Sequence, residues 1–187
     1  MDKFKDFFMK TAFLLAEHSH CVSYHVGAVI VKDNRIISLG YNGTPAGNKN
    51  CDEEFDGKAF DRKAHTEWSN QNEIHAESNA ISFAAKNGLE IKDCDMYVTL
   101  TPCNHCLKNI VAAGIKNVYY YTGYDKSDLN PNITKHVNLV QLRSKNLDKF
   151  LKNNDLVFDS SSCRIEETKK EKKNEIFIKV DEEHKIF

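Results

Sequence analysis

One imidazole, two thiols and one carboxylate stand at spacings that suit metal chemistry. Glu77 follows His75 by two residues, and Cys103 and Cys106 are three residues apart within the run PCNHC at 102–106. One histidine and two cysteines can hold a zinc ion through three protein ligands and leave its fourth position for water. Zinc lowers the pKa of such a water to ~7, and Glu77 is placed to move its protons rather than to bind the metal. We therefore predict a catalytic zinc site.

A closed, structural zinc site is the alternative interpretation of the same residues. It would need a fourth protein ligand, and His105 lies between the two cysteines. Residues three apart share one face of a helix, so Cys103 and Cys106 can converge on one ion while His105 points away from it. We therefore favour the open site over the closed one. We also favour Glu77 as a proton carrier over Glu77 as an ordinary glutamate of a first helical turn.

Helices and strands that position these side chains can be read from the apolar pattern. Thr101 can cap a helix whose first position is Pro102. Gly88 and Gly114 suit helix ends. The expected elements are a helix over 2–20, a hairpin of strands 26–31 and 36–39, a loop over 40–47, a helix from Ile74, a strand over 96–100, the helix after Thr101, a strand over 118–122, a short helix over 146–151 and a strand over 176–180.

This order of elements predicts an α/β fold with a mixed sheet covered by helices. We expect a core over residues 1–130 that contains a polar, weakly periodic insertion at about 48–72. Residues 131–187 are expected to form a C-terminal extension that packs on or flanks the core. Within it, the serine-rich and charged stretch 160–175 suits a solvated segment.

Composition narrows the class of protein. The 187 residues carry a net charge of -1, with 41% hydrophobic and 28% charged residues. The balanced charge argues against a nucleic-acid partner, and no apolar run reaches the ~18 residues of a membrane span. The N-terminus lacks the apolar segment of a secretion signal. Six cysteines, two of them at metal spacing, indicate a reducing, cytoplasmic setting rather than a disulfide framework.

The two motifs together match the H-x-E…P-C-x-x-C signature of zinc deaminases. At these residues the chain resembles the cytidine deaminase-like superfamily and, within it, the deoxycytidylate (dCMP) deaminases of phage or bacterial type. The resemblance runs from about residue 26 to 124. Further matching segments are VGAVI at 26–30, GYNGTPAG at 40–47, NEI at 72–74 and MYVTL at 96–100.

The resemblance implies a three-layer α/β/α fold with a mixed five-stranded sheet, and in many members a homohexamer. It implies hydrolysis of dCMP to dUMP and ammonia, which supplies dUMP for thymidylate synthesis. Hydroxide would add to C4 of the cytosine ring, while Glu77 carries protons to ring N3 and to the departing amine.

The same resemblance implies substrate contacts. Asn42 would contact the sugar or phosphate of the nucleotide, unless it only serves the turn. Glu73 would bind the sugar 3′-hydroxyl, unless it is an ordinary charge near a helix start. The other implied substrate positions are Thr44, the backbone at Ala76 and Thr101, which would hold the base, and Tyr124, which would reach the phosphate or else only pack.

Two further features are implied by the resemblance. Members of the family are often activated by dCTP with magnesium and inhibited by dTTP, and the effector would act on the loop over 40–47, through Tyr41, Gly43 and Gly47. Some phage-type relatives carry a second, structural zinc. Its implied ligands here are Cys21, Cys51 and His65, with the fourth left open among His18, His20 and Asp61, and with unrelated side chains as the alternative.

Three other functions are also compatible with these motifs. A tRNA adenosine deaminase or a free cytidine deaminase would share the zinc site, although a tRNA enzyme should show a basic docking face. A catalytically silent nucleotide-binding regulatory protein is a third alternative. Because such a protein has no need of the carboxylate at Glu77, the sequence favours the enzyme.

Overall fold

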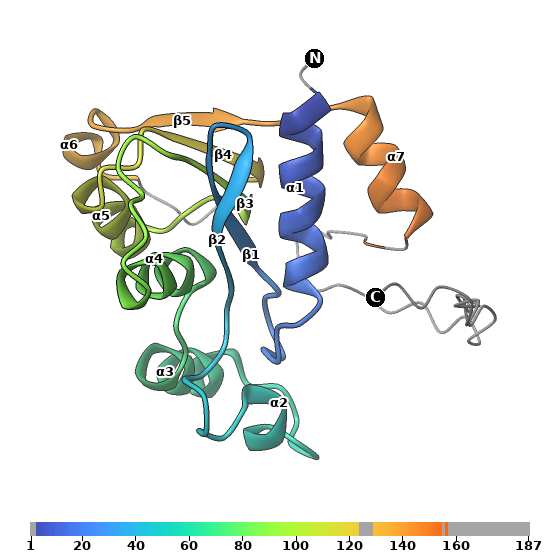
Figure 1. The fold of residues 1–187 in the computed structure, drawn as a ribbon. Coiled ribbons are helices and arrows are strands. Elements are labelled where there is room, and N and C mark those ends of the chain that lie inside the picture. Colours follow the sequence, from blue (N-terminus) through green and yellow to red (C-terminus); the bar gives the residue numbers. More distant parts are fainter. Residues whose placement is uncertain (1–2, 124–128, 155, 157–187) are drawn as a thin grey trace, which may run out of the picture.

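A computed structural model describes residues 3–123, 129–154 and 156 (Figure 1). Its elements, in chain order, are α1 (Lys3–Ala16), β1 (Gly27–Lys32), β2 (Arg35–Tyr41), α2 (Cys51–Glu54), α3 (Arg62–Asn72), α4 (Ala76–Lys86), β3 (Asp95–Leu100), α5 (Asn104–Ala112), β4 (Asn117–Thr122), α6 (Pro131–Thr134), β5 (Asn138–Gln141) and α7 (Lys145–Asn153).

The strands form a five-stranded sheet in the order β2-β1-β3-β4-β5. β1 pairs antiparallel with β2 and with β3, whereas β3–β4 and β4–β5 are parallel. The β1–β2 turn has positive φ angles at Asp33 (50°) and Asn34 (58°), which suit the right-handed twist of a tight hairpin. The expected hairpin and mixed sheet are therefore confirmed.

Both faces of the sheet are covered by helices, because successive residues of its inner strands alternate between two apolar clusters. Ala28 and Ile30 of β1 pack with α4 and α5, in a cluster that includes Ala80, Leu107 and Ile110. Val29 and Val31 face the opposite cluster, with Phe8 and Phe13 of α1 and Leu147 and Leu151 of α7. Figure 1 shows α1 and α7 on one side of the sheet and α4 and α5 on the other. The three-layer α/β/α prediction is confirmed.

Two glycines let helices approach the hairpin closely. A Cβ atom at Gly27 would lie 1.9 Å from the carbonyl oxygen of Ala12 in α1. A Cβ at Gly40 would lie 2.6 Å from the carbonyl oxygen of Ala76 and 2.6 Å from the amide nitrogen of Ala80, both in α4. Since no side chain fits at these distances, glycine sets how closely the first turn of α4 packs on β2.

Both helix starts near the predicted site differ from the expected ones. α4 begins at Ala76 with His75 as its N-cap, because Ile74 instead forms a β-bridge with Gly43. α5 begins at Asn104 with Cys103 as its N-cap, so the prediction of Thr101 as cap and Pro102 as first residue is wrong. The expected helix ends are confirmed, since Gly88 and Gly114 follow the C-caps with φ of 65° and 75°.

The segment over 48–72 is more ordered than its polar composition indicated. It contains the short helix α2 and the eleven-residue helix α3, whose N-cap Asp61 accepts hydrogen bonds from the amides of Lys63 and Ala64. Its apolar periodicity is weak because α3 lies at the rim of the fold, at the lower end of Figure 1, rather than over the sheet.

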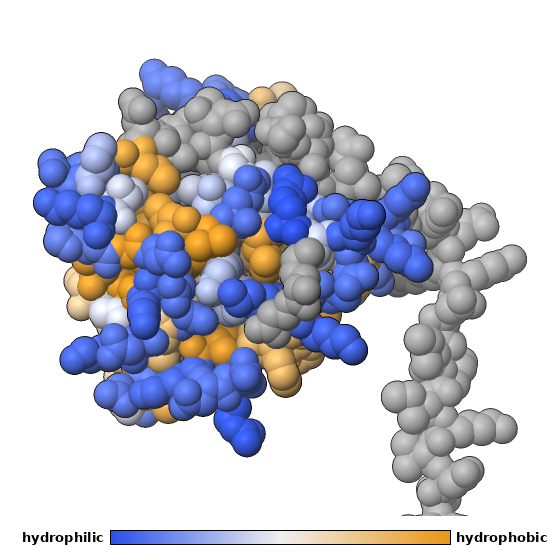
Figure 2. Space-filling model, turned by 90° about the horizontal axis from the view of Figure 1, so that it is seen from above, coloured by the Kyte–Doolittle hydropathy of each residue, from blue (hydrophilic) through white to orange (hydrophobic). Residues whose placement is uncertain are grey.

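The described part of the C-terminal extension adds α6, the edge strand β5 and α7. β5 is only four residues long, with its outer residues exposed, and therefore gave no strand pattern. The expected strand over 176–180, Cys163 and Tyr124 lie outside the described residues. Figure 2 shows apolar side chains reaching the surface among hydrophilic ones on the face at the top of Figure 1. No helix in the described part of the chain is both long and apolar enough to span a membrane.

Candidate active site

The starts of α4 and α5 bring His75, Cys103 and Cys106 together. The Sγ atoms of Cys103 and Cys106 lie 3.6 Å and 3.4 Å from Nδ1 of His75, and the three ligand atoms all lie within 4.8 Å of one another. Ligands held at ~2.1–2.3 Å from a tetrahedral zinc are about 3.5 Å apart. The donor set and its spacing therefore fit zinc with three protein ligands, and no fourth His, Cys, Asp or Glu joins this group among the residues described.

Contacts within this cluster shift the pKa values of its three ligand groups. A hydrogen bond from Cys106 and a further one with His75 lower the pKa of Cys103 to about 3. The hydrogen bond with Cys103 raises the pKa of His75 to about 9, while the shared hydrogen bond and burial raise the pKa of Cys106. Because zinc needs deprotonated ligands, its binding would displace the protons that raised pKa values favour on His75 and Cys106.

Glu77 lies in the first turn of α4, with only 4% of its surface exposed. Burial raises the pKa of its carboxyl group, and the positive charge of His75 partly opposes that shift. A buried carboxyl with a raised pKa can accept and return a proton near neutral pH. The structure therefore places a group suited to proton transfer beside the three-ligand cluster.

The cluster opens into a cavity of about 410 Å³, which His75, Glu77 and Cys103 help to line. One face of α3 forms a wall of this cavity. The residues on that face recur at intervals of three and four, as a helix requires, and are Arg62, His65, Thr66, Ser69 and Asn70, followed by Glu73 just beyond the helix. A cavity of this volume suits a small molecule such as a nucleotide.

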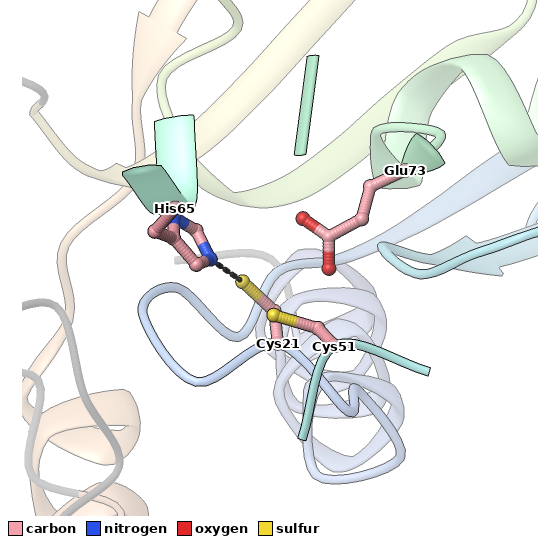
Figure 3. A group of neighbouring side chains, drawn as sticks. All are labelled: Cys21, Cys51, His65 and Glu73. Atoms are coloured by element: carbon pink, nitrogen blue, oxygen red, sulfur yellow. Dashed lines mark hydrogen bonds between the residues drawn. The ribbon is translucent and has the colours of Figure 1, made fainter. Parts of the chain in front are cut away.

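A second cluster lies on the same wall (Figure 3). Cys21, Cys51 and His65 lie together with Glu73, and their four ligand atoms are within 4.8 Å of one another. The predicted group of three is thus brought together, and its fourth member is Glu73. None of the three suggested residues is part of it: His20 pairs with Asp52 at 2.8 Å, Asp61 caps α3, and His18 lies against the Tyr41 ring.

Polar groups of the second cluster are arranged as metal ligands would be. The Sγ atom of Cys21 lies 3.4 Å from Nε2 of His65. Oε2 of Glu73 accepts a hydrogen bond from the Ser69 hydroxyl, while Oε1 is buried without a hydrogen-bond partner among the described residues. Burial lowers the pKa of His65, which favours its neutral, ligating form. A hydrogen bond from Cys21 lowers the pKa of Cys51. Two sulfurs, one nitrogen and one carboxylate make a closed tetrahedral set for zinc.

The expected substrate residues occupy different places. Asn42 lines the cavity, but its Oδ1 accepts from the amide of Val26 and its Nδ2 donates to the carbonyl of Tyr24, which leaves one N–H of the side chain for a ligand. The hydroxyl of Thr44 donates to Asn50 Oδ1, and Thr44 does not line the cavity.

The backbone positions expected to hold a base do line the cavity. Ala76 is the first residue of α4, where amide N–H groups lack partners within the helix. Thr101 donates both its amide and its hydroxyl to the carbonyl of Thr122, so its own carbonyl is the backbone group that a base could meet.

The loop over 40–47, which is expected to respond to effectors, is hydrogen-bonded to the segment that carries His75 and to α4. The amide and carbonyl of Gly43 bond reciprocally with the carbonyl and amide of Ile74, which directly precedes His75. The carbonyl of Tyr41 accepts from Asn79 of α4, and Gly47 has a φ of 89°.

Sequence reasoning missed two features, the place of Glu73 in the second cluster and the place of Arg62 in the cavity wall. Glu73 was expected to bind a sugar, and nothing in its sequence spacing pairs it with Cys21 and Cys51. Arg62 was not singled out, because the helix that carries it was interpreted as an irregular insertion. The recurrence of polar residues at 62, 65, 66, 69, 70 and 73 was a signal that could have revealed this wall.

Known proteins similar to this chain include deoxycytidylate deaminases. A family model described as the cytidine and deoxycytidylate deaminase zinc-binding region matches residues 2–122. The deoxycytidylate deaminase of Enterobacteria phage T2 is 40% identical in a match that covers 76% of this chain and 95% of that protein. The human deoxycytidylate deaminase is also 40% identical, over 66% of this chain and 67% of its own.

A solved structure of a phage dCMP deaminase is also similar to this chain. The crystal structure of dCMP deaminase from the cyanophage S-TIM5 in complex with dCMP and dUMP matches with a TM-score of 0.63 at 34% identity, covering 76% of this chain and 99% of that one. The zinc-site motifs at 75–77 and 102–106 both lie inside the region that the family model matches. This chain belongs to the family of cytidine and deoxycytidylate deaminases.

Proposed function

We propose that this chain hydrolyses dCMP to dUMP and ammonia, with His75, Cys103 and Cys106 as ligands of a catalytic zinc. The observation that carries this proposal is the position of Glu77, a buried carboxyl beside an open three-ligand cluster at the end of a nucleotide-sized cavity. The similarity to a phage dCMP deaminase solved with dCMP and dUMP supports the choice of substrate.

The chain's own residues account for the proton transfers. Zinc bound at this site would supply a water whose pKa is lowered to ~7. Glu77 accepts a proton from the attacking water and delivers it to ring N3 of the cytosine. It then takes the proton of the new C4 hydroxyl and transfers it to the C4 amine, which leaves as ammonia when the C4–N4 bond breaks and the C4 carbonyl forms. Its raised pKa suits both the accepting and the donating step.

The base is held by backbone groups, and the sugar by Asn42. The amide of Ala76, at the first position of α4, suits the O2 carbonyl of a cytosine, and the carbonyl of Thr101 suits its N4 amine. Asn42 contributes its one remaining N–H to the sugar or phosphate. Thr44 would act only indirectly, through Asn50.

A second, structural zinc at Cys21, Cys51, His65 and Glu73 is part of the proposal. Oε1 of Glu73, which has no hydrogen-bond partner within the described part of the chain, supports it, because a buried carboxylate oxygen without a donor is unfavourable unless a cation meets it. Four protein ligands close the coordination sphere, which is typical of a structural site. Glu73 therefore acts as a metal ligand rather than as the group that binds the sugar 3′-hydroxyl.

Regulation and assembly complete the proposal. Binding of dCTP with magnesium, or of dTTP, at Tyr41, Gly43 and Gly47 would reach the active site through the Gly43–Ile74 bridge. A homohexamer would cover the exposed apolar side chains near α4 and β2, which are Leu39, Tyr41 and Phe83. The product dUMP would supply thymidylate synthesis.

A side-by-side assay tests the reaction. We expect the zinc-loaded protein to release ammonia from dCMP with a higher kcat/KM than from cytidine or a tRNA hairpin, and to respond to dCTP and dTTP. Turnover of cytidine or tRNA alone would favour the corresponding relative. No turnover of any substrate by the zinc-loaded protein would favour a regulatory nucleotide-binding protein.

A further inference from the structure

The cavity is lined by two chemically different groups of side chains. His75 and Glu77 belong to one group, and the cytosine ring must lie beside them if the proposed reaction takes place. The cavity wall formed by α3 runs back from Glu73 to Arg62, the first residue of that helix. Eleven helical residues span about 16 Å, so Arg62 begins the wall at the end remote from the zinc ligands.

Arg62 is the only arginine or lysine that lines the cavity within the described part of the chain. Its guanidinium group donates a hydrogen bond of 2.6 Å to the buried hydroxyl of Ser23. It also lies against two aromatic rings, 5.3 Å from the centre of Tyr24 and 4.9 Å from that of Phe60. These three contacts fix the position of an otherwise exposed side chain, which lowers the entropy lost when a ligand binds it.

The charge of Arg62 is not neutralised by a neighbouring acid among the residues described. No carboxylate there lies within ion-pair distance of its guanidinium group. The carboxylate of the adjacent Asp61 instead accepts hydrogen bonds from the amides of Lys63 and Ala64. Since a guanidinium group has five N–H donors and Ser23 takes one, several donors remain for an anion.

Resting on the proposed function, we propose that Arg62 binds the 5′-phosphate of the substrate and thereby sets the preference for the nucleotide over the nucleoside. The base and the phosphate are at opposite ends of dCMP, and Glu77 and Arg62, which both line the cavity, lie on different helices, α4 and α3. A guanidinium fork is suited to bidentate hydrogen bonds with phosphate oxygens. Deoxycytidine carries the same base and sugar but offers Arg62 no anion.

The test compares dCMP with deoxycytidine as substrates of Arg62→Gln. The substitution keeps a polar side chain of similar length and removes the charge. We expect kcat/KM for dCMP to fall about 10- to 100-fold, mainly through KM, since hydrogen bonds between a guanidinium group and a phosphate are lost. The kcat/KM for deoxycytidine should stay within about threefold of the parent. Arg62→Lys, which keeps the charge but loses the fork, should recover part of the loss.

Lys63→Gln is the matched control, because it removes one positive charge from the same helical turn without touching the cavity. It should leave both substrates unaffected. An equal fall for dCMP and deoxycytidine in Arg62→Gln would mean a purely structural role, and an unchanged KM for dCMP would also overturn the proposal.

Binding of the product separates this inference from the proposed function. Calorimetric titration with dUMP and deoxyuridine needs no turnover, and Arg62→Gln should weaken dUMP binding about 10-fold or more while leaving deoxyuridine binding unchanged. A parent that binds dUMP through Arg62 but hydrolyses no dCMP would refute only the proposed reaction. A parent that hydrolyses dCMP while Arg62→Gln binds dUMP equally well would refute only the role of Arg62.

Discussion

Glu73 and His75 are two residues apart, yet their side chains belong to two different ligand clusters. Glu73 turns toward Cys21, Cys51 and His65, whereas His75 turns toward the cysteines of α5. The short extended segment between them ends α3 and begins α4. A metal held by Glu73 would therefore fix the backbone that presents His75, and the two ligand clusters would be coupled through this segment.

The first prediction concerns the metal expected at Glu73 and its effect on the segment that presents His75. Glu73→Gln should lower the zinc content from ~2 to ~1 per chain, because a neutral amide is a poor ligand for zinc. The melting temperature should fall, and dCMP turnover should decrease less than in His75→Ala. Elemental analysis and thermal unfolding measure both effects. Glu67→Gln, which removes the same charge from the exposed side of α3, should keep the parent's zinc content. Zinc content of ~1 in the parent itself would exclude the second site.

The second prediction isolates proton transfer. Glu77→Gln keeps the size and burial of the side chain but cannot carry a proton, so kcat for dCMP should fall by about 10²- to 10⁴-fold. Zinc content and the affinity for dUMP should remain close to the parent values. A turnover within a few-fold of the parent would rule out Glu77 as the proton carrier. Loss of the metal along with activity would instead point to a role in holding the zinc site together.

Residues with local signals were the predictable part of this molecule. His75, Cys103 and Cys106 could be grouped from sequence, because helices that follow strands of the same direction begin at the same edge of a sheet. The hairpin and the helix ends at Gly88 and Gly114 also follow from local turn chemistry.

The wall formed by α3 could not be predicted in the same way. Its stabilisation comes from tertiary contacts, such as the Ser23–Arg62 hydrogen bond and the packing of Phe55 on Trp68, rather than from an apolar stripe. Glu73 likewise meets Cys21 only because the fold brings the segment after α1 to the residue that follows α3. Long-range proximity of this kind leaves no mark in the spacing of one sequence.

The third prediction tests how α4 is positioned. Gly40→Ala would place a methyl group 2.6 Å from backbone atoms of Ala76 and Ala80, closer than any carbon can lie. The first turn of α4 must therefore move away from β2, carrying His75 and Glu77 with it. We expect about a 10-fold or larger loss of kcat/KM for dCMP, since displacements near 1 Å are costly in a preorganised site. Gly57→Ala strains the backbone at a φ of 65° but meets no atom within 4 Å, so it is the control for a loss of stability alone and should retain activity.

The last prediction concerns pH and the packing of α7. Burial and a hydrogen bond to Asp148 of α7 raise the pKa of Tyr121 to about 12 from an ordinary value of 10.0, while the nearby Arg143 opposes the shift. Below pH 10 the phenol is neutral in both the folded and unfolded states, and its full contribution to stability is present. As the pH rises from 10 through 12, the unfolded chain ionises first, so the free energy of unfolding should fall.

Two variants separate the causes of that alkaline loss. Tyr121→Phe should flatten the dependence of the free energy of unfolding on pH above 10, at a cost of about 0.5–1.5 kcal/mol at pH 8 from the lost hydrogen bond. Asp148→Asn removes the negative charge beside the phenol but leaves it buried. Because burial is the larger cause, Asp148→Asn should reduce the alkaline loss without abolishing it. Denaturant titrations between pH 8 and 12 measure these slopes, and an unchanged slope in Tyr121→Phe would assign the alkaline loss to another group.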